Sequence, residues 1–123
     1  MEQLAYLYAI PEKKRRIVVY KKYFDEFFGK QRPKVRDKII WTFELIEQLA
    51  VVPETYLKHL AGTSGLYEIR VQQGSDIFRI FCFFDDGKLV ILINGFQKKT
   101  PKTPKGELQV AEKLKATYYE EKS

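Results

Sequence analysis

The stretch that decides the fold is Leu66–Phe96, LYEIRVQQGSDIFRIFCFFDDGKLVILINGF. Its first part alternates polar and apolar residues, and the next two parts are almost continuously apolar. Gly74-Ser75-Asp76 and Asp85-Asp86-Gly87-Lys88 separate the three parts, and both are turn sequences of the kind that join hairpin strands. The stretch therefore predicts an antiparallel meander of three strands, over residues 66–73, 77–84 and 89–96.

The flanking segments predict one more strand and three helices. Residues 15–20 are short and β-branched, which is typical of a strand, and residues 23–28 form a short helix that ends at Gly29. Residues 33–50 place apolar side chains at helical spacing, and Pro104 suits the first turn of a last helix that Thr103 caps. The predicted class is α+β in the order β-α-α-β-β-β-α. The whole chain, 1–123, forms one domain with residues 1–14 as an N-terminal arm.

Composition narrows the possible functions. The net charge is +6 and the pI is about 9.3, and small proteins this basic often bind polyanions through phosphate contacts, although a merely solvated basic surface is the alternative. One histidine and one cysteine exclude the usual zinc clusters and any internal disulfide. No apolar run is long enough to span a membrane, and the N-terminus lacks the features of a signal peptide. We expect a soluble, cytoplasmic protein with no metal and no cofactor.

Two arginines are the most informative polar residues. Arg79 interrupts an otherwise apolar strand, where an arginine either pairs with an acid or faces a cleft that binds an anion. A structural pair with Glu68 or Asp76 is the simpler alternative. Arg70 lies on the polar face of the preceding strand, and the short hairpin brings it beside Arg79. Two converging guanidinium groups with few acids nearby indicate a phosphate clamp.

Other candidate residues lie at the ends of the strands. Lys98 and Lys99 leave the last strand, and Lys58 and His59 precede the meander. For the lysine-rich loop a solvated surface is the alternative, and for His59 an ordinary surface or half-buried histidine. Cys82 lies in the most apolar strand, so we expect a buried structural thiol. Lys102 and Lys105 continue the basic loop and are candidate RNA-binding residues.

Four motifs in this order resemble one family. They are residues 57–62 (LKHLAG), 65–70 (GLYEIR), 78–81 (FRIF) and 94–101 (NGFQKKTP). Together they resemble the RelE/ParE toxin superfamily, and most closely its phage-derived, HigB-like branch, over roughly residues 35–119. The resemblance implies a small antiparallel or mixed sheet with helices packed mainly on one face. The chain departs from the pattern at Glu68, where some relatives carry lysine, and lacks a tyrosine near the end of the basic loop.

The resemblance implies the toxin of a toxin–antitoxin pair that cuts mRNA on the ribosome. The RNA 2′-hydroxyl would attack the adjacent phosphate, so no metal is required. By position, Arg70 and Arg79 would neutralise the charge that grows on the phosphate. Lys98 or Lys99, whose cationic neighbours favour a neutral amine, would be the base, and His59 or Lys58 the acid.

The resemblance also implies partners and leaves rival functions open. The expected partner is an antitoxin with a helix-turn-helix domain, HigA-like, in a heterotetramer, with a toxin homodimer as another possibility. One rival function is a ParE-like inhibitor that binds a topoisomerase without catalysis. The other is a non-catalytic basic module that binds nucleic acid or a partner protein.

Overall fold

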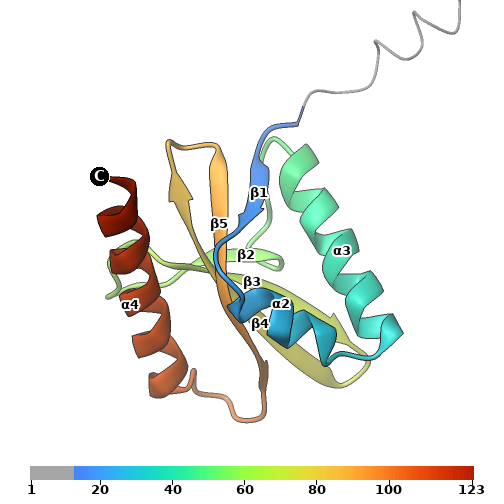
Figure 1. Cartoon of the computed structure of the whole chain (residues 1–123). Helices are drawn as coiled ribbons and strands as arrows, with labels where there is room; N and C mark the ends of the chain where they lie inside the picture. Colours follow the sequence, from blue (N-terminus) through green and yellow to red (C-terminus); the bar gives the residue numbers. More distant parts are fainter. Residues whose placement is uncertain (1–12) are drawn as a thin grey trace, which may run out of the picture.

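A computed structural model describes residues 13–123 and contains one five-stranded mixed sheet in the order β1-β5-β4-β3-β2. Figure 1 shows the sheet between helices that lie on its two sides. The predicted arm, residues 1–14, lies outside the described residues except for its last two. In chain order the elements are β1 (Arg16–Val19), α2 (Tyr23–Gly29), α3 (Pro33–Gln48), β2 (Leu57–His59), β3 (Tyr67–Gln73), β4 (Asp76–Asp85), β5 (Leu89–Lys98) and α4 (Lys105–Lys122).

The predicted meander is confirmed. β3 pairs with β4 and β4 with β5, both antiparallel, while β1 joins the free side of β5 in parallel. Asp86 and Gly87 take φ values of 54° and 73° in the turn between β4 and β5. A turn with two successive positive φ angles matches the twist of the strands it joins, which is why an Asp-Gly sequence is typical of this position.

One strand was not predicted. β2 covers only three residues and pairs antiparallel with β3, so the order is β-α-α-β-β-β-β-α. A run of three residues is too short to show alternation, and β2 is ordered by its pairing with β3. This strand matters for the site because it fixes the directions of Lys58 and His59.

Among residues 13–123, helices cover both faces of the sheet, with α2 and α3 on one face and α4 on the other. Side chains of α2 and α3, including Phe24, Phe27 and Ile39, pack on one face of the central strands. α4 contributes Ala111 and Leu114 to a second core on the opposite face. In Figure 1, α3 and α4 accordingly lie on opposite sides of the strands. Within residues 13–123 no helix is long and apolar enough to cross a membrane.

The long helix α3 ends at Gln48, two residues before the predicted end at Ala50. The Arg15 guanidinium lies at this end, where it donates to the carbonyl oxygens of Ile46 (3.1 Å), Leu49 (2.7 Å) and Ala50 (3.0 Å). These carbonyls lack partners within the helix, and a cation beside them is favourable. Arg15 therefore joins the start of β1 to the end of α3.

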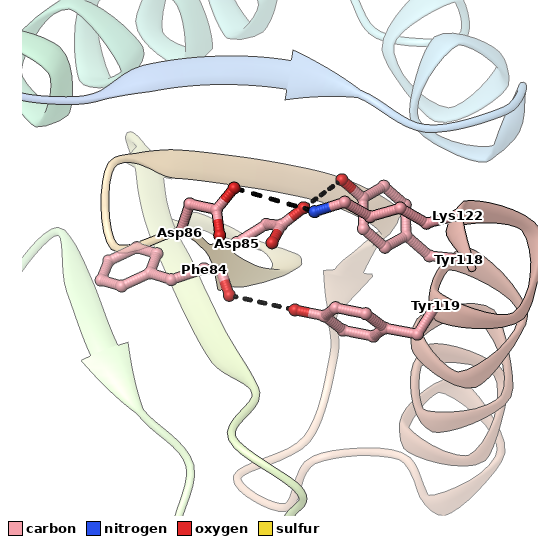
Figure 2. Close-up of polar contacts among 6 residues, drawn as sticks. All are labelled: Phe84, Asp85, Asp86, Tyr118, Tyr119 and Lys122. Carbon is pink, nitrogen blue, oxygen red and sulfur yellow. Dashed lines mark hydrogen bonds and ion pairs between the residues drawn. The ribbon is translucent and has the colours of Figure 1, made fainter.

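The N-terminal cap predicted for α4 is wrong, and its C-terminus has an unpredicted anchor. The cap residue is Pro104, so the Thr103 side chain makes no capping bond. At the other end, Tyr118 and Lys122 each donate to Asp85 Oδ2 over 2.6 Å (Figure 2). The exposed Asp86 lies 3.8 Å from Lys122. This cluster fastens the end of α4 to the turn between β4 and β5.

Candidate functional site

The hairpin of β3 and β4 places the two predicted arginines opposite each other. Arg70 and Arg79 are direct partners in the antiparallel register, so both side chains leave the same face of the sheet. Phe81 and Phe83 lie two and four residues after Arg79 in β4, so their side chains are on the same face as that of Arg79. Both belong to the second core, so α4 covers this face farther along the strands. The expectation that the hairpin brings the two guanidinium groups together is confirmed.

A carboxylate lies between the arginines. Glu68 Oε2 is 3.1 Å from Arg79 Nε and 3.3 Å from Arg70 Nε. Glu68 and Arg79 are 4% and 6% exposed, while a third of the Arg70 side chain remains exposed. The distances establish ion pairs, although the Nε–H directions do not meet hydrogen-bond geometry. The simpler alternative, a structural pair of Arg79 with Glu68, is therefore present, and the same carboxylate also pairs with Arg70.

The other acid considered for Arg79 has a different partner. Asp76 pairs with Arg32 over 2.9 Å at the exposed end of β4. Arg79 instead donates from Nη1 to the carbonyl oxygen of Phe78 over 3.1 Å. Burial lowers the pKa of the Arg79 guanidinium, Glu68 raises it again and Arg70 lowers it. Arginine starts from so high a value that the group stays charged at neutral pH.

Two grooves meet at Arg79. The first has a volume of about 360 Å³ and follows the edge of β3, where Lys38, Thr55, Tyr56, Arg70, Val71 and Gln72 line it with Arg79. The second lies at the end of the hairpin, where Ser75, Ile77, Lys98, Lys99, Thr100 and Pro101 line it with Arg79. Arg79 is thus the residue that both grooves share, and the surface around it carries the cations Lys38, Arg70, Lys98 and Lys99.

The two predicted lysines of the last strand belong to this surface. Lys98 is opposite Ile77 in the register, on the same face as Arg79, and Lys99 lines the same groove. Lys102 and Lys105 lie farther along: the first is exposed in the loop and the second begins α4. Neither lines the two grooves. The structure therefore brings together Arg70, Arg79, Lys98 and Lys99.

The structure separates Lys58 from His59. Lys58 is opposite Glu68 in the pairing of β2 with β3, so its side chain lies on the same face of the sheet as the arginines. His59 is opposite Tyr67 and contacts its ring, with a centroid distance of 5.1 Å, on the other face. The sheet lies between His59 and the arginines, so the expected grouping of His59 with them is wrong.

Cys82 and the acidic residues add no second chemical site. Cys82 is fully buried, as predicted, and burial raises the pKa of its thiol far above the ordinary value. Among the described residues no group of three or more histidine, cysteine or acidic side chains could hold a metal ion.

Three residues of the first groove and its surroundings were not predicted. Lys38 and Tyr56 line the groove, and Trp41 contacts Tyr56 with a centroid distance of 5.7 Å. The sequence holds one signal for them. Trp41 lies outside the apolar face of its helix, so its large aromatic side chain is not needed for the core.

Comparison with known proteins gives the family. A family profile described as phage derived protein Gp49-like (DUF891) matches residues 26–116. The chain belongs to this family. No curated protein matches the sequence.

A solved structure agrees with the fold of this Gp49-like chain. The crystal structure of the archaeal RelE–RelB complex from Pyrococcus horikoshii OT3 contains a similar chain, with a TM-score of 0.50 and 15% sequence identity. The match covers 67% of this chain and 92% of that one. The Gp49-like chain therefore has a RelE-like fold. The family and the fold confirm its recognition as a member of the RelE/ParE superfamily, HigB-like branch.

Proposed function

We propose that this protein is the toxin of a toxin–antitoxin pair and that it cleaves mRNA on the ribosome. One observation carries the proposal. Arg70 and Arg79 lie side by side on one face of the sheet, and Lys98 and Lys99 share a groove with Arg79. Cations in this arrangement suit a phosphodiester whose negative charge grows during reaction. Membership of the Gp49-like family and the RelE-like fold support the same function.

The chemistry uses the RNA's own nucleophile. The 2′-oxygen forms a bond to the adjacent phosphorus while the bond from phosphorus to the 5′-oxygen breaks, which leaves a 2′,3′-cyclic phosphate and a 5′-hydroxyl. Lys98 or Lys99 accepts the 2′ proton, and Lys58, on the same face, supplies a proton to the leaving oxygen. Arg79 and Arg70 stabilise the charge on the non-bridging oxygens. DNA lacks the 2′-hydroxyl and would not react.

Glu68 has a positioning role in this proposal. It lies within 3.3 Å of both Nε atoms, so it holds the two guanidinium groups in fixed directions. It also offsets one of their two positive charges, which limits their repulsion before RNA arrives. Arg70 is one-third exposed, and its Nη1 donates to the carbonyl oxygen of Glu54 over 3.4 Å, which leaves Nη2 to contact a phosphate.

The same carboxylate favours a second candidate function. A nearly buried ion pair between Glu68 and Arg79 is the arrangement of a structural pair. A toxin-family member whose arginines serve the fold would bind its partners without cleaving RNA. A ParE-like topoisomerase inhibitor is one such protein.

The proposed partners follow from the family. The similar archaeal RelE was solved with RelB. For this chain we expect an antitoxin, of the helix-turn-helix type, that covers the basic face, together with mRNA and the ribosome, all in the cytoplasm. A net charge of +6 favours an acidic antitoxin segment.

The test is a reconstituted translation reaction in which mRNA 5′ ends are mapped by primer extension. The native chain should produce new cuts that require ribosomes on the message, and Arg79→Ala should reduce their rate by about 10²–10³. Arg16→Ala, an exposed arginine on β1, is the matched control and should cut normally. Arg70→Ala is a second variant for the case in which Arg79→Ala does not fold. Intact mRNA with inhibition of a topoisomerase in a supercoiling assay would instead establish the ParE-like function.

A further inference from the structure

Two adjoining depressions that share Lys38 lie along the edge of β3, between the arginines and α3. The first groove reaches from Arg79 to Lys38, and a neighbouring depression continues from Lys38 along α3 to Trp41. Lys38 lines both, and Tyr56, in the first, contacts Trp41. We call this surface the edge groove. It is lined by Lys34, Asp37, Lys38, Trp41, Thr55, Tyr56, Arg70, Val71, Gln72, Gln73 and Arg79.

The edge groove exposes an aromatic side chain in a cationic setting. Trp41 is 42% exposed, and the Lys38 ammonium group lies 4.4 Å from the centre of its ring. The lining contains four cationic side chains and a single acidic one, Asp37. A large ring that is partly exposed and has a lysine over it offers a stacking surface beside phosphate-binding groups.

The backbone at this edge is open as well. β2 pairs with β3 only as far as Ile69, and the Arg70 N–H still donates to the Tyr56 carbonyl oxygen over 2.8 Å. Because alternate residues of a strand point their backbone groups to the same side, the N–H and C=O of Gln72 face the groove. In the part of the chain that the structure describes, no strand pairs with β3 there.

We propose that the edge groove binds single-stranded RNA and carries the nucleotides that flank the scissile phosphate. This inference rests on the proposed function, since the groove begins at the proposed cleavage site. A base stacks on Trp41, and Lys34, Lys38 and Arg70 contact the phosphates between it and Arg79. Stacking on a ring is possible for every base, so the groove would hold message of any sequence.

The protein's single tryptophan gives a direct measurement. Trp41 fluorescence is followed while a single-stranded RNA of about 12 nucleotides is added, with all 2′-hydroxyls methylated so that none can react. Stacking on the indole should quench the emission in a saturable way. The same RNA folded into a hairpin should quench less, because its bases are already stacked. Absence of quenching would overturn the proposal.

Variants locate the binding. Trp41→Ala should weaken binding of a labelled form of this RNA about tenfold, the effect of losing one stacked base, as measured by anisotropy. Trp41→Phe keeps a ring and should retain most of the affinity. Ile40→Ala removes a neighbour of similar exposure on the same helix and should bind normally. Equal affinity for Trp41→Ala and the native chain would also overturn the proposal.

A last comparison separates RNA from an acidic protein segment. Polyglutamate offers negative charge without bases. If it binds as tightly as RNA and depends equally on Trp41, the groove serves an acidic partner protein and the proposal is wrong. Because the methylated RNA cannot be cut, these results are independent of cleavage. Quenching without cleavage of ordinary mRNA would support the groove and count against the nuclease, whereas cleavage without quenching would do the reverse.

Discussion

Glu68 determines whether the arginine pair is stable. Glu68→Gln keeps the shape of the side chain but leaves Arg79, 6% exposed, without its counter-charge. Breaking a buried ion pair from one side is costly, and we expect the free energy of unfolding to fall by about 3 kcal/mol. Urea denaturation measures the change.

The double variant Glu68→Gln, Arg79→Met is the control for this prediction. Replacing both members of a buried pair by neutral groups is often tolerated, so the double variant should be more stable than Glu68→Gln alone. A single variant as stable as the native chain would show that the ion pair contributes nothing to the fold.

For single residues, the sequence indicated which residues could belong to the site better than it indicated the face of the sheet on which each side chain lies. Arg70 and Arg79 were found because an arginine in an apolar strand is costly without a partner. The sequence offered Glu68 and Asp76 as partners of Arg79 but could not choose between them, since the nearness of Glu68 to Arg79 depends on a diagonal between two strands. The family resemblance grouped both Lys58 and His59 with the arginines, yet successive residues of a strand face opposite sides, so only Lys58 shares their face.

For the elements, the attachment of α4 to the sheet should depend on pH. Hydrogen bonds from Lys122 and Tyr118 lower the pKa of Asp85, and the same contact raises the pKa of Tyr118 to about 12. Because the folded pKa of Asp85 lies below its ordinary value of 3.8, this stabilisation is complete above that value. It is lost as the pH falls through the folded pKa.

Thermal unfolding between neutral pH and pH values below the ordinary Asp85 pKa tests this attachment. Asp85→Asn should lower the stability at neutral pH and flatten its fall in acid. Asp86→Asn changes the same type of residue at an exposed neighbour and should leave the profile nearly unchanged. An acid profile that is the same in Asp85→Asn and the native chain would contradict the assignment.

Helix α2 packs on β5 so closely that a glycine is required. A Cβ atom at Gly95 would lie 2.6 Å from the ring of Phe27. Gly95→Ala should therefore lower the free energy of unfolding by about 1–3 kcal/mol, the usual effect of overpacking. Phe27→Leu in the same chain should restore part of the loss. Gly106→Ala, in α4 with open space around it, should be neutral or slightly stabilising in the same urea titrations.

For the whole molecule, the two turn sequences and the apolar runs were sufficient to predict the meander. The position of α4 was harder to predict, because its pattern of apolar residues does not indicate which face of the sheet it covers. The short strand β2 and the edge groove arise only from pairing between distant segments. The family resemblance supplied the proposed function, which the pattern of residues alone leaves open.

The central claim is that the surface at Arg79 cleaves translated mRNA, and mapping mRNA 5′ ends in growing cells tests it most directly. The chain is expressed from a tightly repressed promoter beside Arg79→Ala and the control Arg16→Ala. We predict growth arrest with new 5′ ends inside translated messages for the native chain and the control, and neither effect for Arg79→Ala. Arrest with intact mRNA, or cuts that persist in a folded Arg79→Ala variant, would contradict the account.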